Sequence, residues 1–167
     1  MTVRTDSEFD YEIAIDRIRP IAEALVKKYD ELHHIDPDKI LFVVNHKSVG
    51  SRKKVVLART SLAPPKWAEL LYQLGGRSYF YMIEFIAKTT AAMDESQMIA
   101  VVYRELRKIG PEGEILTYDV QDWWQILMGL GRKWYYPENS CPNLLDDSVD
   151  WRKLMGTYYE DIRHEPD

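Results

Sequence analysis

The stretch Met98-Ile-Ala-Val-Val-Tyr-Arg-Glu-Leu-Arg-Lys-Ile-Gly110, followed by Tyr118-Asp-Val-Gln-Asp-Trp123, decides how this chain is interpreted. Asp94 precedes it, with Gln97 three residues later, and this pair is the capping-box pattern that opens a helix. Apolar residues then recur every three to four positions, which predicts an amphipathic helix ending near Gly110. The core-facing positions of this helix are Met98, Val102, Leu106 and Ile109.

Charged side chains occupy the other face of the predicted helix. Arg104 and Lys108 are four residues apart, so both project from one side, and Glu105 stands beside the first. Taken alone, these residues indicate a basic face in contact with solvent, with a weak stabilising contact between Glu105 and Lys108. Whether they carry chemistry instead depends on the sequence around them.

The composition is that of one ordinary domain. The chain has 167 residues, of which 46% are hydrophobic, and this is enough for a single core. The net charge of −5 gives no reason to expect nucleic-acid binding. No apolar run approaches the roughly 18 residues of a membrane span, and the polar start shows no secretion signal pattern. Cys141 is the only cysteine, which excludes an internal disulfide. We therefore expect a cytoplasmic protein without membrane contact.

The first half of the chain predicts one long helix and two strands. Apolar residues within 11–29 recur at helical spacing, and Pro20 is expected to start the main helix rather than to kink a longer one. Residues 40–44 and 55–58 are β-rich runs, predicted as a hairpin or as neighbouring strands. Pro65 can then open a short helix that Gly75-Gly76 ends.

The second half predicts a strand and three helices. Residues 78–86 are the most strongly β-prone run, and Glu84 within it is expected on the solvent side of a half-exposed strand. Besides the central helix, one helix is expected after Tyr118-Asp119 and a last one over about 147–162. The expected fold is a single α+β domain over residues 1–167, with a small mixed sheet packed against the central helix and further helices.

Residues 40–134 resemble the phage metallopeptidase family, a group of small zincin-like domains. In that family an aromatic strand, a helix cap, a His-Glu-Leu-x-His-Ile-Gly helix and a His-Asp-Val segment follow one another. This chain has the corresponding segments in the same order: Tyr81-Met-Ile-Glu-Phe-Ile86, Asp94-Glu-Ser-Gln97, Arg104-Glu-Leu-Arg-Lys-Ile-Gly110 and Tyr118-Asp-Val. The resemblance implies a zincin-like fold of phage or mobile-element origin, with the first and last helices packed on it.

The same resemblance places zinc ligands at three positions that do not hold histidine. The family's three His correspond to Arg104, Lys108 and Tyr118, while Glu105 remains at the position of the general base. Such an enzyme needs two His one turn apart, a third ligand, and a Glu that takes a proton from the metal-bound water. Protonated Arg and Lys cannot ligate a metal and would repel one. We therefore expect no zinc here, with Glu105 as a vestigial base.

The replaced positions allow two arrangements. Arg104 or Lys108 could pair with Glu105 and the Tyr118 hydroxyl, and the cluster would then be structural. If the cations instead face a cleft with Glu84 and Asp119, they would suit a peptide or a small anion. The strand at 79–86 would offer its edge to an extended peptide.

Three interpretations remain open at this point. The chain could be an inactive metallopeptidase-like domain that acts as a binding or regulatory module. It could be an active metal-dependent hydrolase that uses other ligands. It could also be a small globular protein of mobile-element or viral origin with an unrelated present role. The sequence leaves the oligomeric state open.

Overall fold

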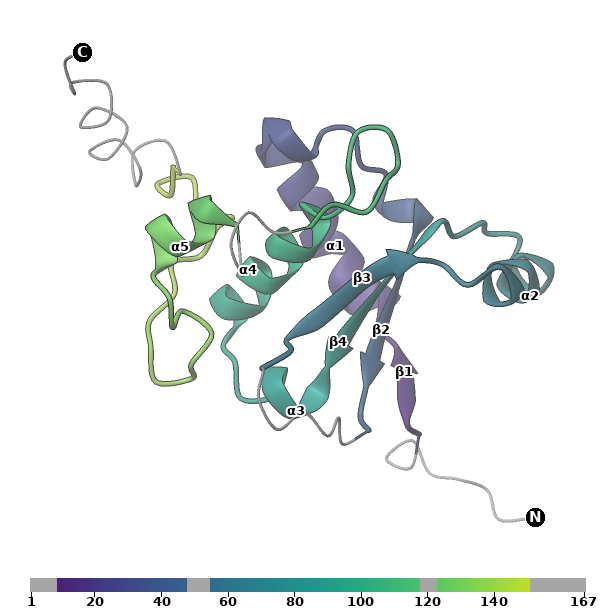
Figure 1. Ribbon diagram of the computed structural model, residues 1–167, viewed down its shortest axis with the longest axis horizontal. Helices are drawn as coiled ribbons and strands as arrows, with labels where there is room; N and C mark the ends of the chain where they lie inside the picture. Colours follow the sequence, from purple (N-terminus) through teal and green to yellow (C-terminus); the bar gives the residue numbers. More distant parts are fainter. Residues whose placement is uncertain (1–8, 48–54, 118–122, 151–167) are drawn as a thin grey trace.

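The computed structural model describes residues 9–47, 55–117 and 123–150, and it confirms a mixed α+β fold (Figure 1). Four strands form one sheet in the order β1-β2-β4-β3. Strands β2 and β4 are parallel, while β1 and β3 run antiparallel to their neighbours. The bounds of the strands are Tyr11–Ile13 (β1), Ile40–Asn45 (β2), Ala58–Leu62 (β3) and Tyr81–Ile86 (β4).

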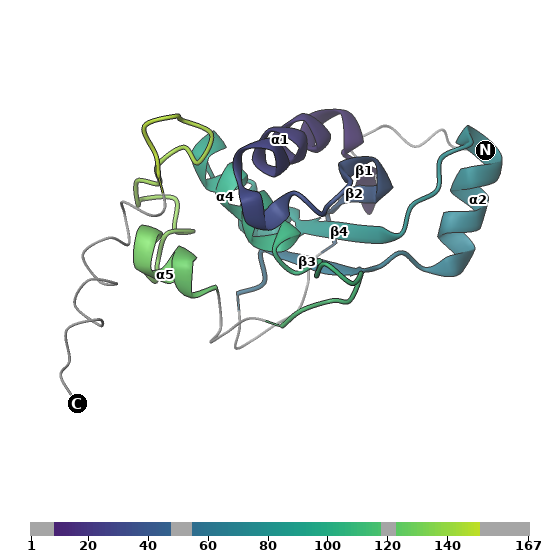
Figure 2. The ribbon, with the colours of Figure 1, turned by 90° about the horizontal axis from the view of Figure 1, so that it is seen from above.

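Helices cover one face of this sheet. Residues that pair across neighbouring strands project to the same side, as Phe42 does with Ile83 and Val44 with Phe85. These four side chains are buried in the main core. Helices α1 (Ile15–Lys28) and α4 (Glu95–Leu106) lie on this face and contribute the rest of that core (Figure 2).

Helix α1 begins earlier than the sequence predicts. We expected Pro20 to start the main helix, but α1 begins at Ile15 and carries Pro20 inside it. Proline removes the hydrogen bond that residue 20 would donate to the carbonyl of Asp16. Burial of Ile18, Ala22 and Leu25 along the same helix offsets that cost. Residues 11–13, which the periodicity assigned to the helical segment, form β1 instead.

The second strand and the order of the sheet also differ from expectation. The strand predicted at 55–58 begins at Ala58 and runs to Leu62. Strand β4 lies between β2 and β3, so these two are neither a hairpin nor neighbours, and β4 is not an edge. After β2 the chain forms the edge strand β3, continues through α2 (Pro65–Gly75), and then returns to the sheet as β4, between β2 and β3. Helix α2 does begin at Pro65 as predicted, and Gly76 closes it in the left-handed conformation at φ 68°.

Helix α4 is the centre of the molecule. The capping box predicted for Asp94 and Gln97 is present, with both hydrogen bonds made. The helix ends at Leu106 and not at Gly110. It is buried around most of its circumference, because the segment 123–149 packs against it as well. The buried side chains of that segment are Trp123, Ile126, Trp134 and Leu144.

The remaining elements are short. Two 3₁₀ turns, η2 (Asp30–Leu32) and η3 (Pro37–Lys39), connect α1 to β2, and α3 (Ala87–Thr90) follows β4. Helix α5 (Trp124–Leu130) begins later than predicted, after Trp123, and Gly131 ends it. Of the helix expected at about 147–162, residues 147–148 form a turn, residues 149–150 have no regular structure, and residues 151–162 lie outside the described part.

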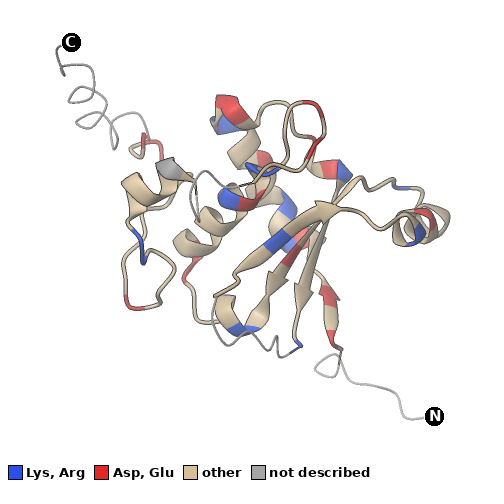
Figure 3. Ribbon diagram, viewed as in Figure 1, with Lys and Arg blue, Asp and Glu red and all other residues tan. Residues whose placement is uncertain are grey.

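Charge and hydropathy fit the composition. Lys, Arg, Asp and Glu are distributed along the described ribbon and do not gather on one element (Figure 3). In the part of the chain that the structure describes, none of the helices combines the length and apolarity that a membrane crossing requires.

Candidate functional site

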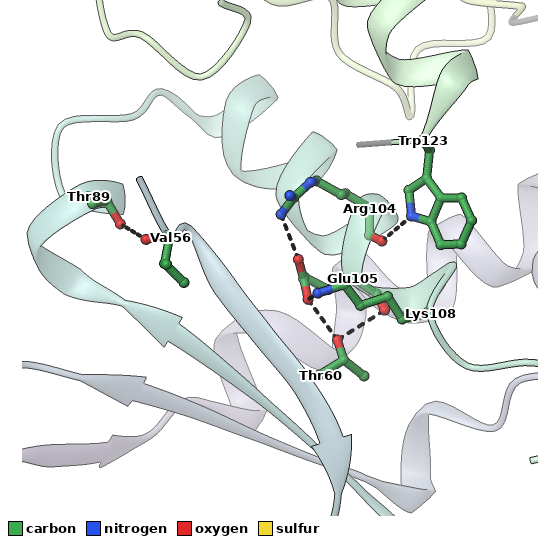
Figure 4. Close-up of polar contacts among 7 residues, drawn as sticks. All are labelled: Val56, Thr60, Thr89, Arg104, Glu105, Lys108 and Trp123. Carbon is green, nitrogen blue, oxygen red and sulfur yellow. Dashed lines mark hydrogen bonds and ion pairs between the residues drawn. The ribbon is translucent and has the colours of Figure 1, made fainter. Parts of the chain in front are cut away.

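Glu105 lies in the last turn of α4 and its side chain is completely buried. Its Oε1 accepts a hydrogen bond from Arg104 Nη1 at 2.8 Å, and its Oε2 accepts one from Lys108 Nζ at 2.7 Å (Figure 4). Both are ion pairs, so one carboxylate holds two cations. The ends of the side chains at positions 104 and 108 therefore meet within the span of one carboxylate group.

Thr60 connects the Glu105 carboxylate to the sheet through a hydrogen bond. It lies on β3 opposite Ile83 of β4 and projects to the helix-covered face. Its Oγ1 lies 2.8 Å from Glu105 Oε2 and 3.1 Å from the backbone carbonyl oxygen of the same residue (Figure 4). The last turn of α4 is thereby joined to a strand at the edge of the sheet.

The two cations do not form a solvated face, contrary to what the helical periodicity alone predicts. The side chain of Arg104 is only 11% exposed and that of Lys108 only 13%. The segment beyond α4 reaches this turn. Trp123 Nε1 donates to the carbonyl oxygen of Arg104 at 2.8 Å, and the Arg107 guanidinium lies 4.6 Å from the centre of the Trp123 ring. Charges in such a position interact more strongly than they would in water.

A tightened turn brings Lys108 back to Glu105. The amide of Lys108 donates to the Glu105 carbonyl at 3.1 Å, and Ile109 donates to Leu106 at 2.9 Å, both with 3₁₀ spacing. The Lys108 carbonyl then accepts a hydrogen bond from the amide of Leu116 at 2.7 Å. Lys108 is therefore held at both its backbone groups, which directs its side chain back over the end of α4.

The other predicted site residues do not join this cluster within the described chain. Glu84 pairs with Arg59 on β3, one position from Thr60, so it projects from the opposite face of the sheet. There its Oε1 accepts a hydrogen bond from Asn45 Nδ2 at 2.5 Å. Glu84 is partly exposed, as expected, but it is separated from Glu105 by the sheet itself. Tyr118 and Asp119 lie outside the described residues.

Thr60 and Trp123 are members of the site that sequence reasoning missed. Thr60 precedes Glu105 by 45 residues, and no local spacing connects the two. A strand placed at 58–62, where it lies, would have put residues 58, 60 and 62 on one face and directed attention to Thr60. Trp123 lies in the core, and its indole N–H also donates a hydrogen bond to the last turn of α4.

A protein-family model described as "Putative phage metallopeptidase" matches residues 9–159. The chain belongs to this family. The match is longer than the resemblance over 40–134 and includes α1 and the whole of the described C-terminal segment. No curated protein and no solved structure gives a significant match.

A metallopeptidase needs a metal ion, and the resemblance drawn from the sequence would assign its ligands to positions 104, 108 and 118. Arg104 and Lys108 do not fit that role, because both are cations directed at the Glu105 carboxylate. In the ranges 9–47, 55–117 and 123–150, no three His, Cys, Asp or Glu residues come together as a metal site would require. His34 contacts the carbonyl oxygen of Ile109 at 2.8 Å, and His46 contacts Glu12.

Proposed function

We propose that this member of the phage metallopeptidase family is a non-catalytic domain, in which an ionic cluster occupies the place of the zinc centre and the sheet edge beside it serves as a binding surface. The observation that carries the proposal is the buried Glu105 carboxylate between Arg104 and Lys108. With a single cysteine and no need for an oxidising compartment, we expect it to work in the cytoplasm.

The cluster would cross-link the segments around it, as a bound metal ion would. A general base needs an oxygen that can accept a proton from a nearby water. Both oxygens of Glu105 instead accept hydrogen bonds from charged donors, and Thr60 adds a further donor to Oε2. These contacts join α4, the turn after it and β3. The cluster thus favours a structural role for Glu105.

The candidate binding surface is the free edge of β3. In the described chain β3 pairs only with β4, and an extended peptide could add as a further strand on its other side. The amide of Ala63 donates to the carbonyl of Phe80, and the amide of Ile86 donates to the carbonyl of Leu57. The backbone groups of every second residue from 57 to 63 therefore point towards β4, and those of the residues between point away from it. By that alternation the amide of Leu62 points away from β4. A peptide that adds to this edge would lie beside Thr60 and the cluster.

Zinc content is the most direct test of the catalytic part. Purified protein is dialysed against metal-free buffer, and its zinc content is measured by elemental mass spectrometry. We expect far less than one zinc per chain. Stoichiometric zinc that survives dialysis, together with casein cleavage that a chelator abolishes, would overturn the proposal. That result would establish the alternative, an active hydrolase with other ligands.

Restoring histidine tests whether the positions are assigned correctly. The triple variant Arg104→His, Lys108→His, Tyr118→His is expected to retain about one zinc per chain, because the ends of side chains 104 and 108 converge in the native fold. The matched control introduces the same number of His at exposed positions, Lys88, Lys66 and Arg132. If the triple variant binds no more zinc than this control, the assignment of residues 104, 108 and 118 as ligand positions is wrong.

Peptide binding is tested with fluorescein-labelled casein. We expect its anisotropy to rise on addition of the protein without release of acid-soluble fragments. Leu62→Pro, which removes an amide from the open edge and spares the ladder to β4, is expected to weaken binding at least tenfold. Equal binding by this variant would show that the edge of β3 is not the surface used.

A further inference from the structure

Helix α2 is exposed on nearly all sides although its sequence is largely apolar. Not one of its residues is buried. Trp67 is 58% exposed, Leu70 42% and Leu74 85%, and Tyr72 on another side is 55% exposed. Figures 1 and 2 show α2 at one end of the molecule, away from the helices that cover the sheet. Within the helix, Leu71 is partly buried against a small apolar cluster of the sheet.

Helix α2 connects two strands that a much shorter turn could join. Strands β3 and β4 are antiparallel neighbours, and Ala63 donates to Phe80 at 2.8 Å to extend their ladder. A tight turn could join them there. The chain instead inserts a helix that adds little to the core of its own molecule. A helix that presents apolar residues to water is expected to have a partner surface.

The exposed surface is of the size that a stable interface needs. Large side chains carry roughly 200 Å² each, so Trp67, Leu70 and Leu74 on one side of α2 together present on the order of 400 Å². Leu62 and Phe80, at the base of the helix, are 60% and 57% exposed and enlarge the patch. Each partner in a stable complex buries roughly 600–1,000 Å².

The spacing of the apolar residues fits a second copy of the same helix. Trp67, Leu70, Leu71 and Leu74 are separated by three, one and three residues, and this pattern is the same in either direction. Two antiparallel copies related by a two-fold axis would therefore place Trp67 against Leu74 at both ends of the contact, and Leu70 against the exposed part of Leu71 at its centre. A single self-complementary stripe is sufficient for such an interface.

Charge also favours an antiparallel pair of α2 helices. Lys66 lies in the first turn, and the last turn carries no basic residue to interact with its carbonyl groups. In the antiparallel arrangement, Lys66 of one copy would lie beside the C-terminal carbonyls of the other, where a cation is stabilising. Helix α5 lies at the end of the molecule opposite α2 (Figures 1 and 2).

From these observations we infer that the protein forms a symmetric homodimer through α2, with the axis between Leu70 and Leu71. The interface uses none of the side chains of the ionic cluster. Leu62 borders both the dimer patch and the peptide edge, but the dimer is tested by molecular mass and cross-linking, whereas the proposed function is tested by zinc content and peptide binding, so failure of one is distinguishable from failure of the other.

Sedimentation equilibrium of the full chain tests the dimer. We expect a mass of twice 19.7 kDa at tens of micromolar protein. Leu70→Glu with Leu74→Glu is expected to shift the protein to monomer while the circular dichroism spectrum of the folded chain is retained, since neither side chain is buried. Val55→Glu is the matched control, because Val55 is 52% exposed at a distant site, and it should remain dimeric.

A disulfide across the axis tests the geometry even if the variants fold poorly. Cys141→Ala gives a background without cysteine, because Cys141 is the only one. In this background Leu70→Cys is expected to form covalent dimers rapidly on oxidation, and Val55→Cys is expected to form few. Wild-type protein that stays monomeric at 100 µM, or equal cross-linking at both positions, would overturn the inference. Monomeric protein that binds lipid vesicles through α2 would assign the surface to a membrane instead.

Discussion

Thr60 and Glu105 are 45 residues apart in the chain, and Thr60 Oγ1 lies 2.8 Å from Glu105 Oε2. The carboxylate is fully buried, so loss of this donor leaves a charged oxygen less well satisfied. We expect Thr60→Val, which keeps the shape of the side chain, to lower the free energy of unfolding by about 1.5–3 kcal/mol. Urea denaturation followed by circular dichroism measures this change. Thr60→Ser retains the hydroxyl and should cost clearly less; equal losses for the two variants would show that the hydroxyl does not contribute.

Removal of one member of the ionic cluster should cost more than removal of all of it. Glu105→Gln removes the negative charge that Arg104 and Lys108 share, and removal of one partner from a buried ion pair typically costs about 3–5 kcal/mol. The triple variant Arg104→Met, Glu105→Gln, Lys108→Met removes the charges together and is expected to be more stable than Glu105→Gln alone. Denaturation curves of both variants test this, with Lys88→Met as an exposed control expected within about 0.5 kcal/mol of wild type. A triple variant less stable than the single one would contradict it.

The elements that the sequence specified well are those with local chemical markers. Asp94 and Gln97 carry a capping box in a fixed pattern, Pro65 suits the first turn of a helix, and Gly76 tolerates a positive φ. Each marker acts within one turn of the chain. The helices that they delimit were therefore predicted from the sequence with correct starts.

The elements that the sequence placed wrongly depend on distant partners. Pro20 was taken as a helix start because its local cost is high, but burial of the same helix against the core outweighs that cost. The position of β4 between β2 and β3 depends on pairings that no short pattern encodes. The burial of the Arg104 side chain likewise depends on tertiary packing around the end of α4, which the helical wheel of α4 alone does not contain.

Gln97 is expected to be more important than an ordinary capping residue. Its Oε1 accepts a hydrogen bond from the Asp94 amide, while its Nε2 lies 3.0 Å from the Trp134 carbonyl and 2.7 Å from that of Tyr136. Gln97→Glu keeps the acceptor and places a carboxylate against these carbonyls in a fully buried site. We expect it to destabilise the protein by more than Asp94→Ala, which loses a cap worth about 1 kcal/mol. Thermal denaturation of both variants shows which is less stable. A smaller loss of stability for Gln97→Glu than for Asp94→Ala would be evidence that Gln97 does not hold the segment 134–136 against α4.

Cys141 is expected to be an unreactive thiol at neutral pH. Burial raises its pKa to about 12, and the nearby charge of Asp94 acts in the same direction. The thiolate is the nucleophile, so iodoacetamide at pH 8 should modify native protein on the order of 1,000-fold more slowly than unfolded protein, whose thiol has a pKa near 8.5. Because the folded state favours the protonated thiol, this contribution to stability is complete below the unfolded pKa. It is lost as the pH rises from there towards 12. Cys141→Ala should therefore lose less stability between pH 8 and 11 than wild type does in urea denaturation at each pH. Identical pH profiles for the two proteins, or native alkylation as fast as that of the unfolded chain, would show that the thiol ionises freely in the folded state.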